Sequence, residues 1–138
     1  TDIVMMLNGA LAGLVAITAE PLTPTPITAM IIGSIGAVIM YYGTKLLENL
    51  GLDDVVGAIP VHMFAGIFGT LVVPLTNADT SFGTQFIGVI SVCVFSFVLS
   101  WITFSTLKST IGLRISRAAE KQGTDKAEVG VVAYSIRD

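Results

Sequence analysis

Long uncharged runs alternate with short polar segments along the first 107 residues. The uncharged runs cover residues 3–19, 21–44, 55–78 and 80–107. Each is close to, or longer than, the ~17–25 residues that an α-helix needs to cross a bilayer. The pattern predicts an all-α, polytopic bundle with four transmembrane helices, at about residues 3–19, 27–44, 54–75 and 82–107.

Small residues recur at helical spacing inside these runs. They form three groups: Gly9 with Gly13, Gly33 with Gly36, and Ala65 with Gly69. Small side chains spaced in this way let helix backbones approach each other closely in a membrane. We therefore expect the first three helices to pack through these positions.

Composition supports a membrane protein, and the distribution of charge gives its orientation. The mean hydropathy is +0.83 and 12% of residues are charged, against about 25% in soluble domains. Six of the seven Lys and Arg residues lie after residue 107, and the seventh is Lys45. The positive-inside rule then makes residues 45–52 and the tail 108–138 cytoplasmic and the proline-rich segment 20–26 external. The tail is expected to hold one short helix, at 116–122.

The start of the chain resembles the continuation of a longer protein. It begins at Thr1 without a basic signal region, and a first helix entering from the cytoplasm would continue a longer protein.

Cys93 is the only cysteine and lies in a membrane run, so neither a disulfide nor a zinc site is expected. No motif indicates an enzyme, a cofactor, a metal or a nucleic-acid partner.

His62 is the only residue between 55 and 78 that can ionise near neutral pH. As a helical residue it would lie roughly 12 Å beyond the pair Asp53–Asp54, near the middle of the ~30 Å hydrocarbon layer. Ionisable side chains at that depth usually face a bundle interior or a water-filled path. Two interpretations remain open: a role in transport, or a neutral imidazole tied to a neighbouring helix by one hydrogen bond.

The residues around His62 add further candidates. Asp53 or Asp54 is expected to cap the third helix or to lie at the cytoplasmic end of a pore. Pro60 removes one backbone hydrogen bond and frees the carbonyl of Val56, which either kinks the helix or leaves that carbonyl to a neighbour. In the first helix, Asn8 either donates a hydrogen bond between helices or faces a pore.

Three stretches resemble the ammonium transporter family (Amt/Mep/Rh). Asn8 to Thr18 (NGALAGLVAIT) is similar to the segment around the eighth helix of that family. Asp53–Asp54 followed by Val61–His62 and AGI is similar to the tenth helix. The third stretch is similar to the end of the last helix and the cytoplasmic tail of the family. It consists of TIGLR at 110–114 with Gly123, Asp125, Glu128, Gly130 and AY at 133–134.

The resemblance implies an eleven-helix ammonium transporter fold, of which this chain would supply helices eight to eleven and the tail. His62 matches the second of the family's two pore histidines. Leu11 and Ala58 match residues lining the hydrophobic pore, and Asn8 matches a polar position beside it. In the family, ammonium gives up a proton and ammonia crosses the membrane beside the histidines.

The resemblance also implies partners: a homotrimer with one pore in each subunit, the surrounding lipid bilayer, and a PII-class regulatory protein at the tail. The tail residues that match are Gly112, Arg114, Gly123, Asp125, Gly130 and Tyr134. The chain departs from the family's usual residues at Gly57, Pro60 and Val129. An ammonium sensor with a cytoplasmic output, and a non-transporting assembly subunit, are the alternative interpretations.

Overall fold

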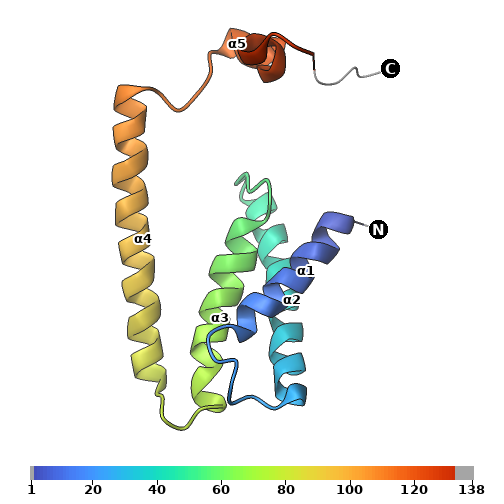
Figure 1. Ribbon diagram of the computed structural model, residues 1–138, viewed down its shortest axis with the longest axis vertical. Helices are drawn as coiled ribbons and strands as arrows, with labels where there is room; N and C mark the ends of the chain where they lie inside the picture. The colour runs from blue at the N-terminus through green and yellow to red at the C-terminus, as the bar shows by residue number, and fades with distance from the viewer. Residues whose placement is uncertain (1, 133–138) are drawn as a thin grey trace. The chain divides into compact units, whose positions relative to one another are not determined.

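The computed structural model describes residues 2–132, which form helices and no strands. Two units can be distinguished, residues 1–93 and 94–138, and each is described by itself. The first unit holds α1 (Ile3–Ile17), α2 (Pro26–Asn49), the π-helix η1 (Ile59–Phe64), α3 (Ala65–Val72) and the 3-10 turn η2 (Val73–Leu75). Helix α4 (Phe82–Thr110) runs from the first unit into the second, which also contains α5 (Arg117–Gln122) and η3 (Asp125–Val129) (Figure 1).

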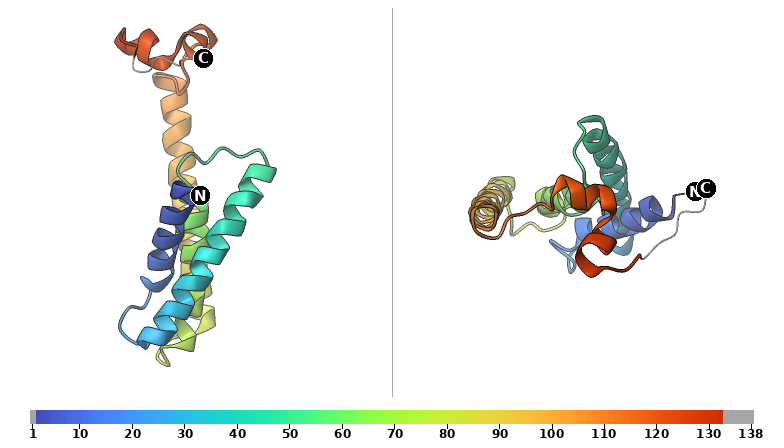
Figure 2. Two further views of the ribbon diagram at one scale, coloured as in Figure 1. Left: turned by 90° about the vertical axis from the view of Figure 1, so that its right-hand side faces the viewer. Right: turned by 90° about the horizontal axis from the view of Figure 1, so that it is seen from above.

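Three helical segments of the first unit pack against one another, with α1 crossing α2 and α3 (Figures 1 and 2). The contact depends on small residues. A Cβ atom added to Gly36 of α2 would come within 2.7 Å of the Ala16 Cβ and 2.9 Å of the Ala12 carbonyl oxygen. A Cβ atom added to Gly69 of α3 would collide with the Ala16 backbone. The expectation that the small residues bring these helices together is confirmed.

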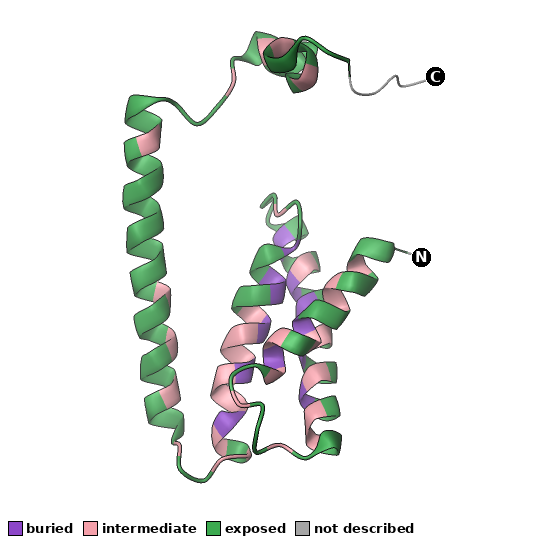
Figure 3. Cartoon of the chain, viewed as in Figure 1, coloured by how far each residue is buried: buried purple, intermediate pink, exposed green. Residues whose placement is uncertain are grey.

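The centre of the packed region is a cluster of apolar side chains from all three segments. Ala12, Met40, Val61 and Ala65 are at most 2% exposed. Met40 comes from α2, Val61 from η1 and Ala65 from α3. Figure 3 shows the buried positions on the facing sides of these segments. Apolar packing at the crossing therefore fixes the residue that immediately precedes His62.

The ends of three helices, α1, α2 and α4, differ from the sequence prediction. The second helix was expected to end at residue 44, but α2 continues to Asn49. Lys45 does not end it, because its ammonium group lies 4.4 Å from the ring centre of Tyr41, one turn earlier, in a cation–π contact. Helix α1 ends at Ile17, before the expected residue 19, and α4 extends to Thr110 rather than 107.

The third helical segment also starts later than expected, at Ile59 instead of 54. Gly57 interrupts the backbone just before it, with a φ of +73°. That value lies in the left-handed region, which a helix of L-residues does not use. The turn at 55–57 therefore separates Asp53 and Asp54 from the helix that the sequence pattern assigned to them.

Helix α4 contrasts with the packed region. It is uncharged up to Leu107, with Lys108 in its last turn, and none of its 29 residues is buried; Figure 3 colours most of it as exposed. At 1.5 Å per residue it would be about 43 Å long, more than the hydrocarbon layer of a bilayer. Within residues 2–132, α2 and α4 are the two helices that are long and apolar enough to cross a membrane. The apolar segments Ile3–Ile17 and Ile59–Leu75 are shorter.

Two loops meet at one end of the first unit. The side-chain amide of Asn77 donates a hydrogen bond of 2.8 Å to the Glu20 carboxylate, and the backbone amides of Leu22 and Thr23 also donate to it. These hydrogen bonds, that from Asn77 first, hold the pKa of Glu20 below its ordinary value of 4.5. The bond joins the loop after α1, which contains the segment 20–26 expected to be external, to the loop before α4.

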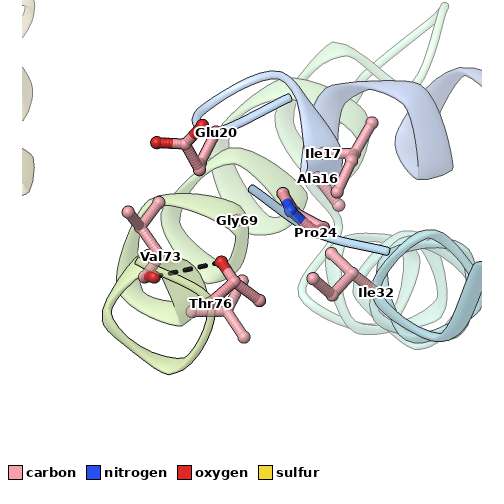
Figure 4. A pocket seen from close by; sticks show the side chains of 9 residues that line it. Ala16, Ile17, Glu20, Pro24, Ile32, Gly69, Val73 and Thr76 are labelled. Carbon is pink, nitrogen blue, oxygen red and sulfur yellow. Dashed lines mark hydrogen bonds between the residues drawn. The ribbon is translucent and has the colours of Figure 1, made fainter. Parts of the chain in front are cut away.

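A small depression lies beside these loops, lined by residues of α1, α2 and α3 (Figure 4). Ala16, Ile32 and Gly69 form its apolar wall, and the Thr76 hydroxyl donates a hydrogen bond of 3.1 Å to the Val73 carbonyl at its edge. The space is too small to hold a water molecule. It is therefore a packing gap rather than a binding site.

In the second unit, α5 confirms the predicted short helix of the tail. The Ser116 hydroxyl accepts a hydrogen bond of 3.1 Å from the Ala119 amide, so Ser116 caps the helix as serine commonly does. At the end of α4, the amide of Gly112 donates to the Leu107 carbonyl and Gly112 has a φ of +82°. This backbone conformation ends the long helix.

Candidate functional site

His62 lies in the middle of the π-helix η1. Its side chain is exposed, and no hydrogen bond joins it to any residue of the described range 2–132. Ala58, four residues earlier, is also exposed, and residues at this spacing lie on one face of a helix. Because Val61 is buried, the backbone is fixed while the imidazole points away from the packed cluster. The π-helix was not predicted; such turns occur frequently at functional sites.

The start of η1 is held by Asp54. Its two carboxylate oxygens accept hydrogen bonds of 2.8 Å from the amides of Ala58 and Ile59. A carboxylate at a helix start satisfies free amides and interacts favourably with the helix dipole. Asp53 is exposed and lies outside the helix. Of the two aspartates that the sequence left as alternatives, Asp54 makes these contacts.

Asn8 of α1 is brought to the same turn. Its side-chain nitrogen donates a hydrogen bond of 3.0 Å to the carbonyl oxygen of Val56, the carbonyl that Pro60 was expected to free. Gly57 is buried beside it, and a Cβ atom added there would lie 2.6 Å from the Asn8 nitrogen. For the Val56 carbonyl, the structure shows the second of the two predicted alternatives, a neighbour that satisfies it, and Asn8 is that neighbour.

Leu11 is half exposed, at 49%, and lies three residues after Asn8 on α1. It immediately precedes Ala12, which belongs to the same buried cluster as Val61. The structure therefore brings the backbones beside Leu11 and His62 together at one level of the bundle, while both side chains remain exposed. Asn8 and Ala58 lie at the neighbouring turn, where η1 begins.

The tail residues singled out from the sequence lie in the second unit. Gly112, Gly123 and Gly130 all have positive φ values, of 82°, 96° and 75°. Arg114 is exposed and Asp125 is half-buried. Tyr134 lies outside the described residues. Between residues 2 and 132 there is no cluster of three or more His, Cys, Asp or Glu residues that could hold a metal ion.

Closely packed apolar helices, two of them long enough to span a bilayer, and one histidine inside an uncharged run are typical of a helical membrane protein. The sequence model of the Ammonium Transporter Family matches residues 1–134. The chain belongs to this family.

Several proteins similar to this chain are named ammonium transporters. The chain is 39% identical to the ammonium transporter Amt2 of Archaeoglobus fulgidus, covering 96% of this chain and 33% of that protein. It is 38% identical to the ammonium transporter Amt1 of Methanocaldococcus jannaschii, covering 93% of this chain and 35% of the relative. The Amt2 protein of the same organism is 34% identical, with 96% and 34% covered. The chain thus spans about a third of the length of the curated relatives that it matches.

Proposed function

We propose that this chain forms the C-terminal portion of an eleven-helix ammonium transporter, and that ammonia passes through a hydrophobic pore beside His62. Ammonium loses its proton before it enters the hydrocarbon region, and Leu11, Ala58 and His62 line the path. The membership of the chain in the ammonium transporter family supports ammonium as the transported species. Family membership also favours transport over ammonium sensing.

The placement of His62 is the observation that carries this proposal. Its imidazole is exposed beside a fixed backbone, within a run that contains no other ionisable group from 55 to 78. An ammonium ion at that depth would be costly, whereas neutral ammonia costs much less. An imidazole can accept or donate a hydrogen bond and can carry a proton near neutral pH. These properties suit the passage of ammonia and the separate transfer of its proton.

The proposal includes the arrangement of the whole protein. The basic tail, 108–138, lies in the cytoplasm and communicates with a PII-class regulator, and the subunits form a homotrimer in the cell membrane. The exposed apolar surface of α4 supports contact with lipid or with other helices. The bond between Glu20 and Asn77 supports the assignment of both loops to the same, external side.

The test is ammonium uptake by the full-length protein that contains these residues, reconstituted in lipid vesicles. His62→Ala should abolish uptake while leaving the detergent-solubilised protein folded, as judged by size-exclusion chromatography and thermal unfolding. Phe97→Ala on α4 is the matched control and should transport normally, because Phe97 is exposed. Normal uptake by folded His62→Ala protein would return His62 to a packing role and overturn the proposal.

A further inference from the structure

The start of the helix that carries His62 has one missing hydrogen bond in its backbone. The amides of Ala58 and Ile59 bind the Asp54 carboxylate, and the amide of Val61 donates to the Gly57 carbonyl over 3.1 Å. By the same four-residue spacing, residue 60 would donate to the Val56 carbonyl. Residue 60 is proline and has no N–H to donate.

The side chain of Asn8 occupies the place of this missing donor. A carbonyl oxygen only accepts hydrogen bonds, so the amide nitrogen of Asn8 must face Val56, and it does so at 3.0 Å. The donor comes from α1, 48 positions away in the sequence. Gly57 makes the approach possible, because a side chain there would fill the space that the Asn8 amide occupies.

We propose that Asn8 is a positioning residue for His62. Its amide replaces the N–H that Pro60 lacks, and it thereby fixes α1 against the turn just before the π-helix, six residues before the histidine. Asn8 thus acts through the backbone at Val56, in addition to any contact with the pore. As far as transport is the measured property, this inference rests on the proposed function.

The test exploits the fact that the missing donor can be restored in two ways. Asn8→Leu keeps the size of the side chain and removes the donor. Pro60→Ala supplies a backbone N–H four residues after Val56. Asn8→Leu should lower the maximal rate of ammonium uptake by the full-length protein about 3- to 15-fold, the range that corresponds to one interhelical hydrogen bond in a membrane. The half-saturation concentration should not change.

The rescue distinguishes positioning from the other roles. Pro60→Ala, combined with Asn8→Leu, should restore most of the maximal rate, whereas Pro60→Ala alone should transport close to normally. Ser34→Ala is the control for loss of a polar side chain, since the Ser34 hydroxyl only bonds within its own helix, to Met30. A change in half-saturation without rescue would show that Asn8 contacts the substrate instead. A normal rate in Asn8→Leu would show that Asn8 only fills space. Either result overturns the inference.

A second readout does not depend on transport. In a protein with His62→Cys as the only reactive thiol, we expect Asn8→Leu to change the rate of alkylation at position 62 by at least about threefold, and Pro60→Ala to reverse the change. If uptake is absent from the wild-type protein but this pattern holds, the proposed function fails and the positioning role stands. Unchanged alkylation in Asn8→Leu, with transport intact in the wild type, rejects the positioning role alone.

Discussion

The packed helices α1 to α3 and the helix α4 are largely uncharged, with Lys45 and Glu48 in α2 and Lys108 in α4, yet they bury their surfaces very differently. In the packed helices, Gly36 and Gly69 let backbones touch, and Ala12 and Ala65 are completely buried. Helix α4 has no buried residue. Apolar character alone therefore does not determine burial in this chain; close packing is found where small residues let backbones approach.

The largest effect should come from enlarging a glycine at the helix crossing. Gly69→Leu places a side chain on the Ala16 backbone and should cost about 3 kcal/mol or more, or prevent folding. Gly88→Leu on α4 is the matched control, because nothing lies within 4 Å of the position of its Cβ. Thermal unfolding and size-exclusion chromatography measure both. Equal losses of stability in the two variants would contradict the difference in burial, since they would show that α4 is packed as tightly in the membrane.

A smaller loss is expected at the turn before η1. Gly57→Ala should destabilise the protein by about 1–2 kcal/mol, because alanine is disfavoured at a φ of +73° and its Cβ would displace Asn8. Gly51→Ala is a useful control, with a similar φ of +68° but open space around it. The difference between the two melting temperatures isolates the contact with Asn8. If the two variants melt at the same temperature, only backbone strain matters at Gly57.

Shortening one apolar side chain sharpens the comparison further. Ile32→Val on α2 removes a methyl group from a side chain that is 4% exposed, and it should cost about 0.5–1.5 kcal/mol. Ile87→Val on α4, where the isoleucine is 66% exposed, should stay within about 0.5 kcal/mol of the wild type. Chemical denaturation in a fixed detergent measures both. A larger loss at Ile87 would place that face of α4 against protein.

The smallest effect should be the pH dependence at the loops. Because the pKa of Glu20 is lowered in the folded protein, its contribution to stability is present above the ordinary value of 4.5. That contribution is lost as the pH falls through the lower, folded pKa. Glu20→Gln should therefore reduce the fall in melting temperature between pH 6 and pH 3. Asp79→Asn in the neighbouring loop is the control. An unchanged pH profile in Glu20→Gln would mean that the Asn77 bond does not contribute to stability.

The sequence predicted the helices well because charge and proline mark their limits in a membrane protein. The prediction was less successful where a side-chain contact decides whether a residue belongs to a helix. Lys45 reads as a loop residue, but its contact with Tyr41 keeps it in the helix. Asp54 reads as the first residue of a helix, but its carboxylate reaches amides four and five residues ahead. In both cases the deciding contact lies on a neighbouring turn, where a pattern of apolar positions carries no information.

The candidate site could be located from sequence but not assembled. His62 is conspicuous because it is the only histidine in an uncharged run. The interaction at Val56 was foreseeable in part, since Pro60 leaves that carbonyl without its usual partner. The identity of the partner was not, because Asn8 lies in another helix and nothing in the local sequence couples it to Val56. Such a pairing follows from how α1 crosses the bundle.

The π-helical turn η1 has a consequence for sequence divergence. A π-helical turn closes its hydrogen bond over one residue more than an α-helical turn, so η1 is equivalent to an α-helix with an inserted residue. Removing one residue between Ile59 and Phe64 would restore a regular helix while Ala65 and Gly69 kept their orientation toward α1. The removal would change the orientation of the residues within the turn. Insertions and deletions in this turn can thus change the direction of the histidine, together with that of the buried Val61, while α3 keeps its orientation toward α1.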